Sequence, residues 1–372
     1  MTRVLITGGA GFLGTHVASA LVAREDVDLV VAGDVRLPAE PLAGVVYEEC
    51  DVTRAGALAP LLERHGIDVV VHLAAIVNPG RDHDLEYRVD VDGSRHVLEA
   101  CVAAGIRRIV VSSSGAAYGY HPDNPAWLRE SDPIRGNDEF AYSKHKRLVE
   151  EMLTIHRAEH PELEQVVFRI GTILGPTVQN QITALWDGPR ILAVRGSDSP
   201  FVFIWVDDVA GAMARAATDG PPGIYNVAGD GRMTVHEIAA RLGKPVLTVP
   251  ASVLGLVLQV GRAFRLTVHG PEQVRFLRYR PVLANDALKA EFGFTPARTS
   301  REAFDAYLAT HPDVARPPRA ARPPGAARPP GAARLPRAAD SPRAADSPRT
   351  ADSPRAAHPN SSTSACHRPR GH

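Results

Sequence analysis

A tyrosine and a lysine spaced for acid–base chemistry stand at positions 142 and 146, in the segment FAYSKHKRLVEEML that begins at Phe140. The apolar residues of this segment repeat at helical spacing, and side chains four positions apart share one face of a helix. An ammonium group beside a phenol favours the phenolate, and lowering a tyrosine pKa from about 10 to near neutral takes roughly 4 kcal/mol. Tyr142 is therefore a candidate general base toward a hydroxyl, with Lys146 as its partner.

A glycine-rich turn near the N-terminus indicates a phosphate ligand. The stretch VLITGGAGFLG, residues 4–14, reads as strand, tight turn and helix, with glycines at positions 8, 9, 11 and 14. Such a helix directs its unpaired N–H groups and positive dipole end at a pyrophosphate above the strand, and glycine lets the phosphate approach. The strand and the helix on either side favour this reading over a glycine-rich turn that binds nothing.

The acid that ends the next apolar run indicates which dinucleotide binds. Residues 28–34, DLVVAGD, read as a buried parallel strand that ends in Asp34. A carboxylate there accepts both ribose hydroxyls of adenosine and repels a 2′-phosphate, so we predict NAD and not NADP. Arg36 would argue for NADP, unless it is a solvated surface residue. Asp51, at the exit of a strand predicted at 45–52, either meets the adenine amino group or caps a helix.

Alternating strands and helices position these side chains. Beyond the first three strands, the sequence predicts a helix over 57–65, a strand over 68–75, a helix over 89–104 and a strand over 108–112. This alternation is typical of a doubly wound parallel sheet, in which ligands lie above the carboxyl ends of the strands. The sequence therefore predicts an α/β fold with a Rossmann-type sheet and one ligand-binding edge.

Four motifs, TGGAGFLG, HLAA, SSSGAAYG and YSKHK, carry a family resemblance. In their order and spacing the chain resembles the extended short-chain dehydrogenase/reductases, in their NAD-dependent epimerase/dehydratase branch. The resemblance implies that Tyr142 is the catalytic base, that Lys146 binds the nicotinamide ribose, and that Ser114, more than Ser113, polarises the reacting carbon–oxygen bond. It also implies a homodimer. The predicted cofactor-binding residues are Gly8, Gly11, Phe12, Leu13, Gly14, Asp34, Asp51, Val52, Leu73, Ala74, Ala75, Tyr142 and Lys146.

The second half departs from the pattern of the sugar-nucleotide epimerases that it otherwise resembles. Thr172 stands where these enzymes usually have Asn, Phe201 where they have a phosphate-binding Arg, and Trp205 where they have His. The missing Arg removes a bidentate charge-assisted contact to a diphosphate. Arg280 matches a second Arg that often binds phosphate, whereas Asp90 replaces a common Asn and leaves a proton relay there unsupported. The predicted substrate-binding residues are Ser114, Thr172 and Arg280.

The chain divides by composition into a folded body and a tail. We predict an NAD-binding core over 1–175, to which strands from 201–230 return, and a smaller substrate lobe over 176–310. Residues 311–372 contain RPPGAA and RAADSP repeats, lack apolar residues that could form a core, and are predicted to be disordered. The tail is a solvated appendage, a weak polyanion-binding arm or a set of Ser-Pro phosphosites at Ser341, Ser347 and Ser353.

Charge, cysteine content and hydropathy limit where in the cell the protein is expected to work. The net charge of zero is the sum of an acidic body and a tail that holds eleven Arg and three Asp after Val314. Three widely spaced cysteines indicate neither a disulfide framework nor a metal site, so we expect a cytoplasmic protein. The N-terminus enters a strand at once, with no room for a signal peptide. The apolar run 246–260 is too short to span a bilayer and is predicted to be a buried or lid helix, in preference to a membrane-surface helix.

These patterns together favour NAD-dependent epimerisation of a sugar nucleotide, of the UDP-hexose 4-epimerase type, through a transient ketone. The alternative is an NAD-dependent alcohol dehydrogenase or ketone reductase for a less charged, steroid-like or lipidic substrate, which Phe201 and Trp205 would suit. A non-catalytic dinucleotide sensor is a third reading, but binding alone does not need Ser114, Tyr142 and Lys146. No specific nucleic acid, membrane span or metal is expected.

Overall fold

Seven parallel strands form the central sheet of the protein. The structure is a computed structural model and describes residues 1–78, 80, 82–264, 266–267 and 270–315. The strand order is β10-β6-β5-β4-β1-β2-β3 and every pairing in this sheet is parallel. The chain turns back between β1 and β4, which is where ligands bind in sheets of this kind. The predicted Rossmann-type α/β fold is confirmed.

The strands are short apolar runs, as parallel strands covered on both faces require. Their bounds are β1 Thr2–Thr7, β2 Val27–Asp34, β3 Val45–Glu49, β4 Val69–His72, β5 Arg108–Ser114, β6 Glu164–Ile170, β7 Thr172–Leu174, β8 Ile191–Val194, β9 Phe203–Trp205, β10 Gly223–Val227 and β11 Val246–Val249. The pairs β7–β9 and β8–β11 form two small separate sheets. β10 follows β7, β8 and β9 in sequence yet joins the edge of the central sheet.

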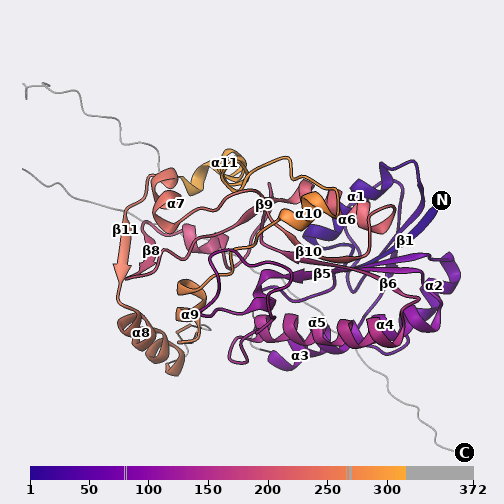
Figure 1. Cartoon of the computed structure of the whole chain (residues 1–372), viewed down its shortest axis with the longest axis horizontal. Helices are drawn as coiled ribbons and strands as arrows, with labels where there is room; N and C mark the ends of the chain where they lie inside the picture. The colour runs from indigo at the N-terminus through magenta and orange to yellow at the C-terminus, as the bar shows by residue number, and fades with distance from the viewer. Residues whose placement is uncertain (79, 81, 265, 268–269, 316–372) are drawn as a thin grey trace, which may run out of the picture. The chain divides into compact units, whose positions relative to one another are not determined.

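Helices cover both faces of the central sheet. They are α1 Phe12–Val22, α2 Ala59–His65, α3 His83–Tyr87, α4 Gly93–Ala103, α5 Ala141–Glu159, α6 Val206–Ala217, α7 Val235–Leu242, α8 Ala251–Ala263, α9 Gln273–Arg278, α10 Asp286–Ala290 and α11 Ser300–Thr310. Figure 1 shows α1 and α6 on one side of the sheet and α4 and α5 on the other. Each pair packs over its own apolar core, so the sheet is buried on both faces.

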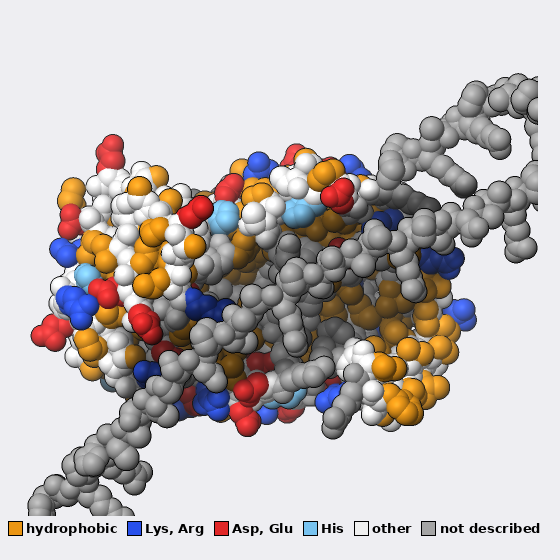
Figure 2. All heavy atoms as spheres, turned by 180° about the vertical axis from the view of Figure 1, so that it is seen from behind, with side chains coloured by type: hydrophobic (Ala, Val, Ile, Leu, Met, Phe, Trp, Pro, Cys, Tyr) orange, Lys and Arg blue, Asp and Glu red, His pale blue; other side chains and the backbone are white. Residues whose placement is uncertain are grey.

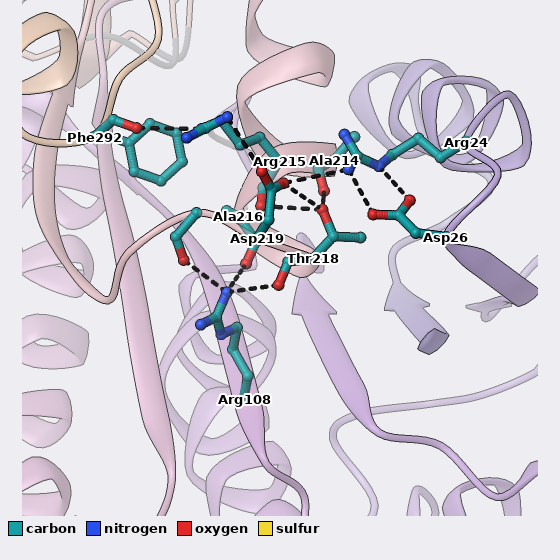
Figure 3. A network of polar contacts seen from close by, with 10 residues as sticks. Arg24, Asp26, Arg108, Ala214, Arg215, Ala216, Thr218, Asp219 and Phe292 are labelled. Atoms are coloured by element: carbon teal, nitrogen blue, oxygen red, sulfur yellow. Dashed lines mark hydrogen bonds and ion pairs between the residues drawn. The ribbon is translucent and has the colours of Figure 1, made fainter. Parts of the chain in front are cut away.

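A buried arginine fastens α6 to the sheet. Arg108, the first residue of β5, donates from one guanidinium nitrogen to the carbonyl oxygens of Ala216, Thr218 and Gly220 (Figure 3). The last carbonyls of a helix have no partners within the helix, so a cation at this place is stabilising. A second side of the guanidinium pairs with Glu164 of β6. The contact fixes α6, and with it the residues that follow β9, relative to the central sheet.

Three predicted elements differ from the structure. The helix predicted over 89–104 begins earlier, with α3 and a π-helical turn, Arg88–Asp92, ahead of α4. The apolar stretch VVFRIGTILGP, residues 166–176, predicts a single sixth strand, but it breaks at Gly171 into β6 and β7. The apolar run 246–260 is a strand and a helix, since Pro250 lies between β11 and α8, and the prediction that it is buried is wrong because α8 exposes an apolar face.

The last regular element among the described residues lies just past α11. A 3₁₀ turn at Pro312–Val314 continues regular structure slightly beyond position 311. The predicted disordered tail otherwise lies outside the described residues. Among the residues that the structure describes, no helix is long and apolar enough to cross a membrane.

Candidate active site

One cavity of about 870 Å³ lies at the carboxyl ends of the central strands. Every residue predicted to bind cofactor or substrate lines it, although the residues come from eight separate stretches of the chain. They are Gly8, Gly11, Phe12, Leu13, Gly14, Asp34, Asp51, Val52, Leu73, Ala74, Ala75, Ser114, Tyr142, Lys146, Thr172 and Arg280. The size suits a dinucleotide together with a second molecule, since ligand pockets typically measure about 300–1,000 Å³.

The glycine turn is built so that side chains cannot fit. Gly8 has φ +71°, and a Cβ there would lie 2.8 Å from the Ala74 nitrogen. A Cβ on Gly14 would lie 2.3 Å from the Gly8 carbonyl oxygen, so α1 starts in contact with the turn itself. Gly11 and the first residues of α1, Phe12, Leu13 and Gly14, line the cavity, which is the position of an anion site at a helix N-terminus.

The carboxylate of Asp34 is fixed beside this turn. Its Oδ2 accepts from the Ala10 N–H at 3.1 Å and its Oδ1 from the Arg36 N–H at 3.3 Å. Arg36 is exposed, and it also lines the cavity next to Asp34. Asp51 accepts from the amide and hydroxyl of Thr53, and α2 begins only at Ala59, so the alternative that Asp51 caps a helix is wrong. Two carboxylates thus line the end of the cavity beside β2 and β3.

Tyr142 and Lys146 share one face of α5, as their spacing predicted. The Lys146 ammonium nitrogen lies 5.7 Å from the centre of the Tyr142 ring, and it donates to the Ser112 carbonyl oxygen at 2.9 Å. Lys146 is buried, whereas Tyr142 is half-buried and borders the cavity. The buried ammonium is therefore held by β5 beside the phenol ring.

The structure separates the two serines at the end of β5. Ser113 donates from Oγ to the Glu150 carboxylate, which is buried, so its hydroxyl is committed to the core. Ser114 caps the following 3₁₀ turn by accepting from the Ala116 N–H at 3.1 Å, and its hydroxyl retains a hydrogen to donate. This difference favours Ser114 over Ser113 as the hydroxyl that meets a substrate oxygen.

An arginine held between two phenyl rings lines the other end of the cavity. The Arg280 guanidinium lies 3.7 Å from the ring centre of Phe201 and 5.1 Å from that of Phe276, and it donates to Ser199. Burial lowers the pKa of Arg280 to about 9. Phe201 therefore packs against the Arg280 guanidinium, and its own side chain is uncharged. Trp205, the last residue of β9, is buried in an apolar core and does not line the cavity, so it does not shape the substrate end as expected.

A buried pair that the sequence did not reveal lies beside α5. Asp90, on the π-helical turn, accepts from Nδ1 of His145 at 2.9 Å and from the Ile76 N–H at 2.8 Å. Ile76 lines the cavity, so the carboxylate holds a cavity wall and α5 together. Asp90, which stands where the family pattern has Asn, thus pairs with a buried histidine. The 55 residues between Asp90 and His145 gave no basis for predicting this contact from the sequence.

Sequence reasoning also missed several wall residues of the substrate end. They come from loops and from α9, where no periodic pattern marks a position, and they are Tyr120, Thr177, Asn180, Gln181, Ile182 and Phe276. This set contains amide, hydroxyl and apolar side chains and no cation. Arg280 is therefore the cation that the substrate end offers to a substrate.

A neutral histidine lies beneath the cavity. The Ser94 hydroxyl donates its proton to the Asp90 carbonyl oxygen, so Ser94 Oγ can only accept from Nε2 of His72. The other ring nitrogen of His72, Nδ1, then carries no proton and accepts from the Thr7 hydroxyl. Burial, together with the nearby Lys146 charge, lowers the pKa of His72 to about 3. The imidazole therefore stays neutral in the folded protein.

This histidine should make stability depend on pH. The unfolded chain protonates His72 near its ordinary pKa of 6.5 and the folded chain only near 3, so the stabilisation is complete above 6.5 and is lost as the pH falls toward 3. We expect His72 to remove roughly 2 kcal/mol of unfolding free energy between about pH 7 and about pH 5. Urea unfolding of the wild type and of His72→Gln measures this difference, and equal pH slopes for the two proteins would refute it.

Fold and site together define the class. A Rossmann sheet with a glycine turn at β1, an acid at the end of β2, a serine after β5 and a Tyr-x-x-x-Lys pair on α5 is the arrangement of a short-chain dehydrogenase/reductase. The sequence pattern of the NAD dependent epimerase/dehydratase family matches residues 4–228, and the chain belongs to that family. The resemblance predicted from the four motifs is confirmed, and the prediction of NAD agrees with it.

Relatives by sequence cover different parts of the chain. The uncharacterized protein Rv0501 of Mycobacterium tuberculosis is 25% identical over 311 residues, which is 82% of each chain. The UDP-glucose 4-epimerase of Azospirillum brasilense is 34% identical over 180 residues, 46% of this chain and 49% of that protein. Similarity to the named epimerases is therefore found over about half of each chain.

Solved structures share the fold. The Bordetella bronchiseptica enzyme WbmG, in complex with NAD and UDP, has a TM-score of 0.66 at 20% identity, with 84% of this chain and 95% of that chain covered. The UDP-glucose 4-epimerase of Thermus thermophilus, in complex with NAD, has a TM-score of 0.63 at 24% identity, with 82% and 99% covered. At these identities the likeness extends to the fold alone.

Proposed function

We propose that the chain is an NAD-dependent epimerase that acts on a sugar nucleotide of the UDP-hexose type. The observation that carries the proposal is that Ser114, Tyr142 and Lys146 line one cavity together with the glycine turn. A dinucleotide sensor would need the turn and Asp34 but not this set. The two described cysteines, Cys50 and Cys101, are buried free thiols, which fits the cytoplasmic location that we propose.

The residues at the β1–β4 crossover fit NAD. A Cβ on Gly8 or Gly14 would meet the backbone of Ala74 or of Gly8, so this tight turn needs glycine at both positions, and Asp34 lines the same cavity. We infer that the turn holds the pyrophosphate, Asp34 the adenosine ribose and Lys146 the nicotinamide ribose. Bound NAD supplies a hydride acceptor that can also return the hydride.

The chain's own side chains move and hold the proton. Tyr142, as the phenolate, takes the proton of the substrate hydroxyl as the hydroxyl carbon is oxidised. The Lys146 ammonium lies beside the Tyr142 ring, and Ser114 donates a hydrogen bond to the developing ketone oxygen. When the ketone turns over and is reduced on its other face, Tyr142 gives the proton back.

Arg280 is the residue that we propose to bind the substrate phosphate, with Thr172 nearby on β7. It is buried between Phe201 and Phe276, where a charge-assisted hydrogen bond is stronger than in water. A guanidinium in low dielectric without an anion is costly, so an anionic substrate group at this place would stabilise it.

The surroundings of Arg280 also favour a second candidate function. The substrate end offers one cation where the epimerase pattern has two, and phenyl rings flank it. An NAD-dependent alcohol dehydrogenase for a less charged, largely apolar substrate would use this wall and the same Ser114, Tyr142 and Lys146.

A panel of sugar nucleotides separates the two functions. An epimerase returns its hydride, so we expect UDP-glucose and UDP-galactose to interconvert while the absorbance of NADH does not grow. The measurement is chromatography of the sugar nucleotides alongside continuous absorbance. Steady NADH production from an alcohol substrate, with no isomer formed from any sugar nucleotide, would favour the dehydrogenase.

A further inference from the structure

The helix α8 presents an apolar face that nothing in the described structure covers. Its apolar side chains and those just after it are between 46% and 82% exposed, and they are Val253, Leu256, Val257, Val260, Phe264 and Leu266. The first five follow the spacing of a single helix face. Figure 2 shows these hydrophobic atoms gathered at the lower right of its view, where α8 lies. A patch of this kind marks an interaction surface.

The opposite side of α8 is anchored to the substrate end of the protein. Leu254 is buried, and α8 packs against α9, where Val274 approaches Gly255. α9 in turn contributes Phe276 to the cavity wall, four residues ahead of Arg280. The apolar face therefore belongs to the same group of helices that borders the substrate end.

The charge around this face is positive. Residues 251–279 contain four arginines and a single glutamate, within a body that is otherwise acidic. Arg262, on α8, pairs with Glu272 at 3.2 Å, and Arg275, on α9, pairs with Glu139 at 3.4 Å, but both arginine side chains are more than half exposed. Exposed ion pairs of this kind contribute little free energy, so both guanidinium groups can exchange their carboxylates for lipid phosphates. An outward apolar stripe with arginines at its border is the pattern of a helix that lies in the surface of an anionic membrane.

Other occupants suit this face less well. A second copy would place the same stripe against itself across a twofold axis, which brings the arginines of both copies together. The chain's own C-terminal tail has a single large apolar residue after position 315, Leu335, and is itself rich in arginine. Neither offers both the apolar area and the negative charge that the face lacks.

We propose that the α8 face docks the enzyme on an anionic lipid bilayer, with the apolar stripe inserted among the lipid chains and Arg262 and Arg275 at the headgroups. The helix lies flat in the surface, since its 13 residues are too few to span a bilayer. Docking leaves the substrate end of the cavity next to the membrane.

Vesicle sedimentation with the full-length protein tests the proposal. Wild type should bind phosphatidylglycerol vesicles more strongly than phosphatidylcholine vesicles, and Leu256→Glu/Val260→Glu should weaken binding to phosphatidylglycerol at least about tenfold, which is about 1.4 kcal/mol. Ile155→Glu is the matched control, because Ile155 is equally exposed on α5 and should leave binding unchanged. All variants keep the basic C-terminal tail, which can itself bind anionic vesicles. High salt weakens this contribution of the tail to vesicle binding, so the comparison is repeated at high salt.

The remaining outcomes overturn the proposal. Equal vesicle binding by wild type and the double variant would place the membrane contact elsewhere, and absence of wild-type binding would remove it. A wild-type dimer that the double variant converts to monomer, with vesicle binding unaffected, would assign the face to a second copy. Melting temperatures close to that of wild type show that the exposed substitutions leave the fold intact, so that loss of binding is not loss of structure.

Discussion

Tyr142→Phe should lower turnover at least about a hundredfold, the usual scale for removing a positioned acid–base group. The change keeps the ring that Lys146 faces and removes only the oxygen that would carry the proton. NAD affinity and unfolding free energy should stay close to those of wild type, because the glycine turn and Asp34 are untouched. Steady-state kinetics on the true substrate, with calorimetric titration of NAD, measure both.

The matched control is Tyr225→Phe. Tyr225 lies in β10 outside the cavity, and its hydroxyl donates to the Pro222 carbonyl oxygen. Its loss should cost a little stability and leave turnover within a few-fold of wild type. If Tyr142→Phe turned over as fast as Tyr225→Phe, another group would have to be the base.

Arg169→Met should destabilise the protein by about 3–5 kcal/mol, because it leaves a buried carboxylate without its partner. Arg169 and Glu150 are 6% and 3% exposed, and Arg169 Nη2 lies 2.7 Å from Glu150 Oε2. The other Nη donates to the Tyr118 hydroxyl and to the Glu130 carbonyl. This pair joins β6 to α5, and therefore supports the helix that carries the Tyr-Lys pair. Urea unfolding measures the loss.

Two companion variants sharpen this test. Arg241→Met removes one partner of an exposed pair, with side chains 41% and 36% exposed, and should cost less than about 1 kcal/mol. Removing both buried charges, in Arg169→Met/Glu150→Met, should be less destabilising than removing the arginine alone. A cost for Arg169→Met no larger than that of Arg241→Met would show that water compensates the Glu150 carboxylate.

The cofactor side of the cavity could be predicted because its signals are local. A strand, a glycine turn and a helix occupy adjacent residues, and the Tyr142–Lys146 spacing is a property of a single helix. Each is a pattern within one short stretch, and the sheet order then brings the stretches to one edge. Asp34 followed from its place at the end of a buried strand.

The contacts of the substrate side could not be predicted because they join distant segments. The family resemblance pointed to Arg280, but not to Phe201 and Phe276, the rings that hold it. Asp90 likewise meets His145 across 55 residues. No periodicity records which side chains of separate loops will meet. The apolar run of α8 likewise gave no sign of its exposure, since hydropathy does not tell whether a neighbouring element covers a helix.

The most direct test of the proposed chemistry is a label on the hydrogen that moves. Sugar nucleotides with deuterium at the hydroxyl-bearing carbon C4 are incubated with the enzyme in ordinary water, and the products are separated and analysed by mass spectrometry. The account predicts that the C4 epimer forms with its deuterium retained and with no hydrogen taken from solvent. Deuterium that accumulates in NADH, with no epimer from any sugar nucleotide, would contradict it.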